Sequence, residues 1–91
     1  MEENVNILIL KNYVISSTYR QKVVETLKKK EMMIPTKLAK ASDIHTAHIS
    51  NVLRDLKNKD IVECLNEEVC RGRLYRLTDT GLKVYDAMHK I

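Results

Sequence analysis

The chain has 91 residues, of which 44% are hydrophobic and 31% are charged, as expected for one domain with a single small core. Only two Gly and one Pro occur, which argues against a turn-rich all-β fold. The longest apolar run, Ile7–Leu10, is too short to span a membrane. Glu2 and Glu3 stand where a signal peptide would carry positive charge, so we expect a cytoplasmic protein.

The net charge of +4 is concentrated in one stretch of the chain. Residues Arg20–Lys40 include seven basic and two acidic side chains, whereas the flanking regions are close to balanced. Such a block suits a polyanionic partner. A solvated, lysine-rich surface would give the same count, so charge alone does not choose between the two.

The N-terminal third predicts one clear helix after an ambiguous segment. Residues 5–15 fit neither the helical nor the strand period cleanly, and we favour a helix. Ser16 and Ser17 are suitable caps for a helix over residues 18–31. The predicted apolar face of that amphipathic helix consists of Tyr19, Val23, Val24 and Leu27.

The middle of the chain predicts two helices joined by a tight turn. Met32–Ile34 is a short apolar stretch that suits an edge strand, because Pro35 ends it. Pro35 can open a helix that runs to Ala41 and buries Leu38 and Ala39. After a break at residues 42–44, a second helix begins at His45 or Thr46 and ends near Asn58.

The second of these helices has an unusual polar face. Its apolar stripe recurs at i, i+3, i+4 and i+7, from Ile49 to Leu56. A helix that needed only solubility would carry Glu and Lys on the other side, yet small and hydrogen-bonding side chains predominate there. Ala47, Asn51, Arg54 and Asn58 lie opposite the stripe, with Thr46 and Ser50 on one flank and His48 and Asp55 on the other.

The C-terminal third predicts a hairpin and a last helix. Ile61–Leu65 and Leu74–Leu77 are short strands, and residues 66–73 form a long polar loop between them. Thr78 caps a helix over Asp79–Lys90. We expect the apolar face of this helix to be Leu82, Tyr85 and Met88 or His89.

This order of elements predicts a mainly helical α+β fold in a single domain, residues 1–91. A close helix pair followed by a hairpin is a winged helix-turn-helix, here with an extra N-terminal segment and a C-terminal helix. The second helix of such a pair enters the major groove of DNA. The hairpin is the wing, and Arg71 and Arg73 near its tip can reach phosphates or a narrow minor groove.

Several runs of residues resemble archaeal winged-helix transcriptional regulators of the MarR- and ArsR-like superfamily. These runs are residues 16–20, 35–40, 44–56, 60–62 and 72–81, and together the resemblance covers Tyr13 to Met88. Within the archaeal set, the chain resembles euryarchaeal regulators of archaellum genes. Two positions depart from the pattern: Asp60 replaces a common Gly, and His45 replaces the usual Ser or Thr at the helix start, so Thr46 is an alternative cap.

The resemblance implies sequence-specific binding of double-stranded DNA, and the residue chemistry agrees. Asn can bond bidentately to adenine and Arg to guanine, while Ala47 or the Thr46 methyl can pack on a thymine methyl. Lys37 and Lys40 suit phosphate rather than bases. Two structural alternatives are that Ser50 only packs and that Arg54 pairs with its neighbours Asp55 or Asn58. The predicted DNA-binding residues are Pro35, Thr36, Lys37, Lys40, His45, Thr46, Ala47, His48, Ser50, Asn51, Arg54, Arg71 and Arg73.

Rival functions receive less support from the residues. The three histidines have no paired carboxylate at a catalytic spacing, and there is no phosphate-cradling Gly loop, so we expect no enzyme. Cys64 and Cys70 are too widely spaced for a typical zinc pair, and we expect reduced thiols, no metal and no cofactor. The serious alternative is a winged helix used as a protein-interaction module within a larger complex.

A homodimer is the expected working unit, because one winged helix covers only a short stretch of DNA. Apolar residues at both ends could pair across a two-fold axis, although they could instead complete the monomer core. The transcription machinery is a further expected partner, and a membrane is not. The apolar residues in question are Val5, Ile7–Leu10, Val14, Leu82, Tyr85, Met88 and Ile91.

Overall fold

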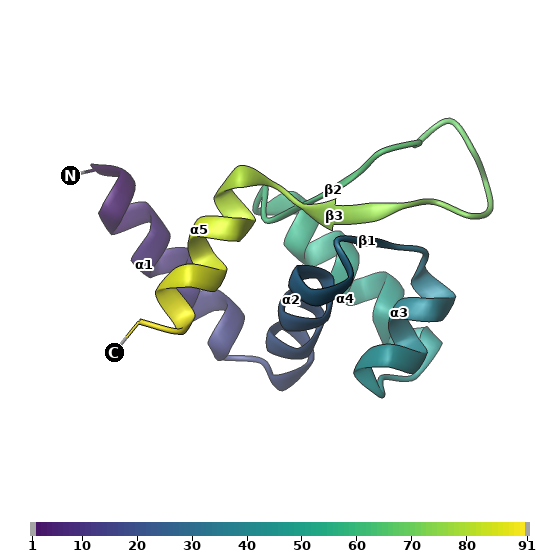
Figure 1. The fold of residues 1–91 in the computed structure, drawn as a ribbon, viewed down its shortest axis with the longest axis horizontal. Coiled ribbons are helices and arrows are strands. Elements are labelled where there is room, and N and C mark those ends of the chain that lie inside the picture. Colours follow the sequence, from purple (N-terminus) through teal and green to yellow (C-terminus); the bar gives the residue numbers. More distant parts are fainter. Residues whose placement is uncertain (1, 91) are drawn as a thin grey trace.

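The computed structural model describes the backbone of residues 2–90 and the side chains of residues 5–90. Ile91, one of the predicted dimer-contact residues, lies outside the described residues. The helices are α1 (Glu2–Ile15), α2 (Thr18–Lys30), α3 (Pro35–Ser42), α4 (Thr46–Asn58) and α5 (Asp79–Met88), and the strands are β1 (Met32–Met33), β2 (Val62–Cys64) and β3 (Tyr75–Leu77) (Figure 1).

The order of elements confirms the predicted winged helix-turn-helix. The ambiguous N-terminal segment is a helix, as favoured, and it lies beside α5 at one end of the molecule (Figure 1). Helix α5 ends at Met88 rather than Lys90. None of the helices in the described part of the chain is long and apolar enough to cross a membrane.

The sheet is small and antiparallel, with strand order β1-β3-β2. Met32 pairs with Arg76, and Val62 pairs with Leu77, so β3 lies in the centre. Strand β1 is therefore an edge strand, as predicted from the proline that follows it. The loop between β2 and β3 extends from the body of the molecule as the wing (Figure 1).

Short polar side chains end or begin the helices as their positions predicted. The Ser17 hydroxyl accepts from the Arg20 N–H, and the Thr78 hydroxyl accepts from the Gly81 N–H. Asp43 and Asp60 have φ values of 57° and 59°, the left-handed conformation that Asp adopts more readily than most residues. The departure at Asp60 is thus accommodated by the fold.

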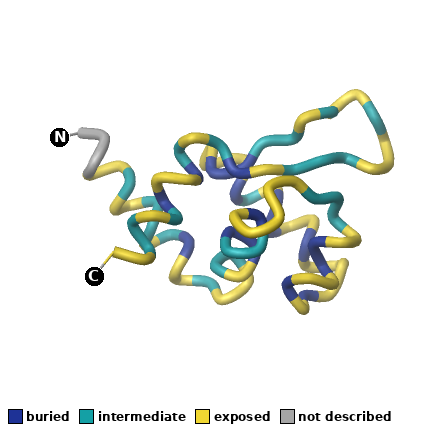
Figure 2. Tube along the Cα trace, viewed as in Figure 1, coloured by how far each residue is buried: buried dark blue, intermediate teal, exposed yellow. Residues whose placement is uncertain are grey.

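The core lies where α2, α3 and α4 meet the sheet, and the buried positions cluster there in Figure 2. Helix α1 contributes Val14 to it, and α5 contributes Val84. The other buried apolar residues are Val23, Val24, Leu27, Leu38, Ala39, Ile44, Ile49, Val52, Leu53, Leu56, Ile61, Val62 and Leu77.

Two predicted core residues are in fact exposed. Tyr19 retains 41% of its surface, because the first turn of α2 extends past the core that receives Val23 one turn later. Leu82 retains 38%, since α5 turns Gly81 and Val84 inward instead. The backbone of α5 lies close to Ile61 at Gly81, where a Cβ atom would collide with the Ile61 carbonyl oxygen. Tyr85 and Met88 are half-buried, as their predicted face requires.

Candidate nucleic-acid interface

The start of α4 is capped by a histidine. The Nδ1 atom of His45 accepts the N–H of Ala47 at 3.1 Å, so His45 does what a Ser or Thr hydroxyl commonly does at this position. The alternative in which Thr46 is the cap is wrong, since Thr46 is the first residue of the helix. Because Nδ1 is an acceptor here, the neutral ring carries its proton on Nε2.

The two faces of α4 are separated as the sequence predicted. Ile49, Val52, Leu53 and Leu56 are buried and hold the helix against the core. The opposite face carries no buried residue, so its polar side chains are free to meet a partner. Exposed there are Thr46, Ala47, His48, Ser50, Asn51 and Arg54.

A groove brings part of this face together with α3 and the wing. Ser50, Asn51 and Arg54 form its floor, and the start of α3 and the wing form its walls. Ser50 is exposed, so its side chain is not part of the buried core. Other lining residues that the sequence had singled out are Pro35, Thr36, Arg71 and Arg73.

Two further candidates lie on α3 without lining the groove. Lys37 and Lys40 are exposed on α3, beside the groove wall that Pro35 and Thr36 form. They suit contacts with a polyanion at the edge of the site.

The wing is held in shape by side chains that bond its backbone. The Asn66 carboxamide accepts the Leu74 N–H at 2.7 Å and donates to the Gly72 carbonyl at 3.2 Å. Arg73 donates through Nε to the Val69 carbonyl at 2.8 Å and through Nη2 to the Glu67 carbonyl at 3.1 Å. The guanidinium of Arg73 is therefore largely committed within the loop.

Arg71 differs from Arg73 in this respect. It is exposed, and the described residues offer it no hydrogen bond or ion pair. The wing is also tied to α4, because Lys57 forms an ion pair with Glu67. The cation that the wing presents freely is thus Arg71.

The other flank of α4 faces α2. The Tyr19 and His48 rings lie 5.3 Å apart, and the His48 and His45 rings 6.4 Å apart. Further along, Asp55 lies 4.0 Å from Arg20, so the predicted alternative of an Arg54–Asp55 pair is not what the structure contains. The sequence pattern missed Tyr19 as a neighbour of this surface, because helical periodicity placed it with the core.

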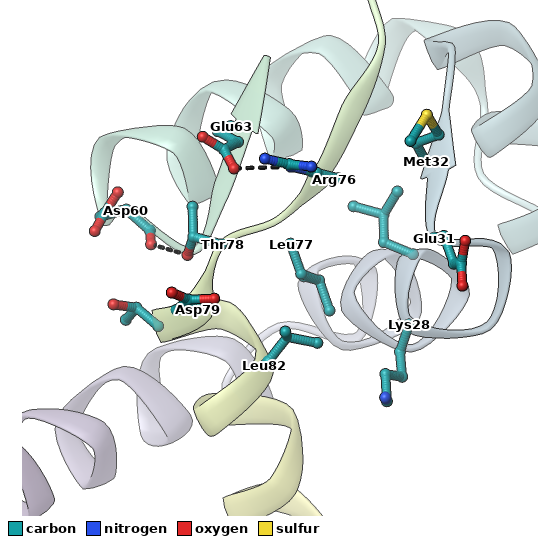
Figure 3. A pocket seen from close by; sticks show the side chains of 12 residues that line it. Lys28, Glu31, Met32, Asp60, Glu63, Arg76, Leu77, Thr78, Asp79 and Leu82 are labelled. Atoms are coloured by element: carbon teal, nitrogen blue, oxygen red, sulfur yellow. Dashed lines mark hydrogen bonds and ion pairs between the residues drawn. The ribbon is translucent and has the colours of Figure 1, made fainter. Parts of the chain in front are cut away.

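A second hollow, where the end of α2 meets the sheet and α5, has the opposite electrostatic character (Figure 3). Four carboxylates line it, against only two basic side chains. One of those, Arg76, is paired with Glu63 at 2.9 Å. This surface is therefore unsuited to binding phosphate. The carboxylates belong to Glu31, Asp60, Glu63 and Asp79.

The two cysteines form no site of their own. Cys64 is half-buried with its thiol 3.6 Å from the Asn66 side-chain oxygen, and Cys70 is exposed on the wing. Among the described residues, no group of three or more His, Cys, Asp or Glu side chains could hold a metal ion.

Taken together, the helix pair, the exposed polar face of α4 and the hairpin define a winged helix-turn-helix domain. Neither a protein-family model nor a curated protein matches the sequence. Solved structures do match, and they are winged-helix transcription regulators of the MarR type, so the chain has the fold of that group.

Three of these structures illustrate the similarity. The antimony-specific transcriptional repressor AntR has a TM-score of 0.75 at 20% identity, over 89% of this chain and 69% of its own. A cysteine-to-serine mutant of MarR from E. coli, complexed with operator DNA, has a TM-score of 0.73 at 25% identity, over 97% of this chain and 66% of its own. A MarR-family transcription regulator has a TM-score of 0.67 at 23% identity, over 88% and 60%. The chain thus spans about two thirds of the length of these proteins, and the resemblance to archaeal regulators in particular stays a prediction.

Proposed function

We propose that this chain is a transcriptional regulator that binds double-stranded DNA sequence-specifically, with α4 in the major groove and the wing on the backbone or in the minor groove. The observation that carries the proposal is the groove in which the exposed face of α4 meets Arg71 of the wing. An α-helix fits the major groove, and a basic hairpin beside it meets the phosphates. The similarity to a MarR structure complexed with operator DNA supports the same assignment.

The side chains divide by the contacts that their chemistry allows. Asn51 and Arg54 on the groove floor would read adenine and guanine through bidentate hydrogen bonds. Ala47 and the Thr46 methyl would pack on thymine methyl groups. The residues assigned to the backbone rather than the bases are Pro35, Thr36, Lys37, Lys40, His45 and Arg71, whereas Arg73 would act by shaping the wing through its bonds to the loop carbonyls.

Base reading is tested by single substitutions on a DNA site selected from a randomised duplex library. Asn51→Ala and Arg54→Ala should each cost about 1–3 kcal/mol of binding free energy and relax base preference at one position. The matched control is Arg76→Ala, which removes an arginine that lines the acidic hollow. If both α4 variants bind and select like the parent protein, the reading face is wrongly assigned.

The rival function, a protein-interaction module, predicts a different outcome of the same selection. Modules of that kind tend to carry acidic or large apolar residues on the second helix, whereas this face is small, polar and basic. A chain that enriches no duplex from the library, at low salt as well as at physiological salt, would favour the module.

We also propose that the DNA-bound unit is a homodimer joined through α1. Part of α1 completes the monomer core: Val14 is buried, and Ile7 and Leu10 pack against it. The rest presents an apolar surface, since Val5, Leu8 and Ile9 are 56%, 54% and 60% exposed. A second copy of the same surface would cover it across a two-fold axis.

A further inference from the structure

Tyr19 is an aromatic side chain at the edge of the DNA-facing surface that no role yet explains. It lies in the first turn of α2 and retains 41% of its surface, although its neighbour one turn later, Val23, is fully buried. Among the described residues, its hydroxyl has no hydrogen-bond partner. Its ring rests against His48, with the centroids 5.3 Å apart and the planes tilted by 38°.

The ring contact restricts where the Tyr19 hydroxyl can go. Tyrosine has only two rotatable side-chain bonds before the ring, so a ring held on one side leaves little further freedom. His48 is itself anchored on α4, within the turn that the His45 cap closes. The hydroxyl is therefore kept near the start of the reading helix at small entropic cost.

The flank on which Tyr19 lies is the one without the wing. Ser50, Asn51 and Arg54 face the groove that the wing closes, whereas His48 and Asp55 face α2. A helix about 10–12 Å across nearly fills a major groove about 12 Å wide. Phosphate strands therefore border it on both flanks, and Arg71 accounts for one side only.

We propose that Tyr19 makes the second backbone contact: its hydroxyl donates a hydrogen bond to a phosphate on the α2 flank of α4, and His48 is the positioning residue that holds its ring. This inference rests on the proposed DNA binding and adds a residue outside the helix-turn-helix pair and the wing. Tyr hydroxyl groups are among the ordinary donors to DNA phosphate.

An uncharged donor has a distinctive signature in the salt dependence of binding. Counterion release follows from the neutralisation of phosphates by Lys or Arg, and a tyrosine hydroxyl neutralises none. Loss of the Tyr19 contact should therefore weaken binding without flattening the plot of log K against log salt. Since phosphates carry no sequence information, the loss should be equal for all duplexes.

The test compares Tyr19→Phe with the parent on selected and randomised duplexes over a range of salt. We expect about tenfold weaker binding to both, an unchanged salt slope, and loss of one phosphate from the ethylation-interference pattern. The matched control is Tyr85→Phe on α5, whose ring also rests on an imidazole, 4.4 Å from His89. That variant should bind like the parent.

The positioning role of His48 has its own variants. His48→Ala should lose the same phosphate from the interference pattern, whereas His48→Phe, which keeps a ring beneath Tyr19, should retain it. If Tyr19→Phe binds like the parent while Asn51→Ala is impaired, the Tyr19 contact is refuted and the DNA-binding function stands. A parent that binds no duplex DNA at any salt refutes both.

Discussion

At the scale of single residues, the two wing arginines do different work. Arg73 satisfies the carbonyl groups of Val69 and Glu67, and it thereby helps to define the loop. Arg71 is exposed and carries its charge outward from that loop. The sequence predicted both as equivalent DNA contacts. The hydrogen bonds give Arg73 a role within the loop, and we propose that only Arg71 contacts DNA directly.

Separate substitutions of Arg71 and Arg73 should distinguish the DNA contact from the role within the loop. Arg71→Ala should weaken binding to all sequences and reduce the slope of log K against log salt by about one unit, the effect of one lost phosphate contact. Arg73→Ala removes two bonds to backbone carbonyls and should make the wing more sensitive to limited proteolysis. Fluorescence titrations over a salt series, together with a proteolysis time course, check both. Equal effects of the two variants in both assays would contradict the division.

Residue contacts of this kind mark the limit of what the sequence could predict. Arg73 and Arg71 look alike in a polar loop, because the carbonyl positions that distinguish them follow from the loop's path. Tyr19 shared the helical period of Val23, yet periodicity says nothing about where a core ends. The cap of α4 was equally ambiguous in the sequence, because either the His45 imidazole or the Thr46 hydroxyl could accept a backbone N–H of the first turn. The structure contains the bond to His45.

At the scale of elements, the close packing of α5 on the sheet depends on Gly81. Its position lets the helix approach the Ile61 carbonyl, which also accepts the Thr78 N–H at 3.0 Å. Gly72 in the wing is the opposite case: a φ of +72° favours glycine, but a Cβ there would meet no atom within 4 Å. One glycine is needed for space and the other for backbone conformation.

Alanine substitutions should rank these two glycines. Gly81→Ala should destabilise the domain by about 1–3 kcal/mol, because the backbone of α5 and the Ile61 carbonyl must move apart. Gly72→Ala should cost only roughly 1 kcal/mol, the expense of a left-handed alanine. Thermal unfolding measures both, and in a domain of this size each kcal/mol shifts Tm by about 4–8 °C. The reverse ranking would mean that α5 can move away from Ile61 without cost.

The helices were predictable from the sequence where the hydrophobic periodicity and the N-cap residue indicated the same boundary. Helix α4 carried an apolar stripe over two turns and a boundary near His45, and the structure confirms it within a residue. Helix α5 had a clear cap in Thr78, yet its buried face was wrongly assigned to Leu82. The inward face was set by close approach at Gly81 and by Val84, a tertiary constraint that the local pattern does not contain.

At the scale of the whole molecule, the exposed apolar face of α1 predicts the assembly state. Leu8→Glu and Ile9→Glu each place a charge on a surface that is more than half exposed, so the monomer should remain folded. In a dimer joined there, either charge would be removed from water at the interface and should dissociate the subunits. Sedimentation at micromolar concentration, with and without DNA, measures the change.

The control for that experiment is an acidic substitution at another exposed apolar side chain. Met32 on the edge strand is 44% exposed, so Met32→Glu alters charge and hydrophobicity without touching α1. We expect this variant to sediment like the parent. A parent chain that is monomeric in both conditions, bound one per site, rules out the dimer.

The junction between α1 and α2 would set the distance between the two α4 helices in such a dimer. Only two residues separate the helices, and their N–H groups bond to the carbonyls of Asn12 and Val14. Arg20 connects the two helices at this corner: its guanidinium lies 3.9 Å from the Tyr13 ring centre, donates to the Tyr13 carbonyl and approaches Asp55 of α4. Two copies joined through α1 would therefore hold their α4 helices at one separation. Inserting a base pair between half-sites turns one of them by about 35°, and the contacts at this corner would oppose the rotation needed to follow it.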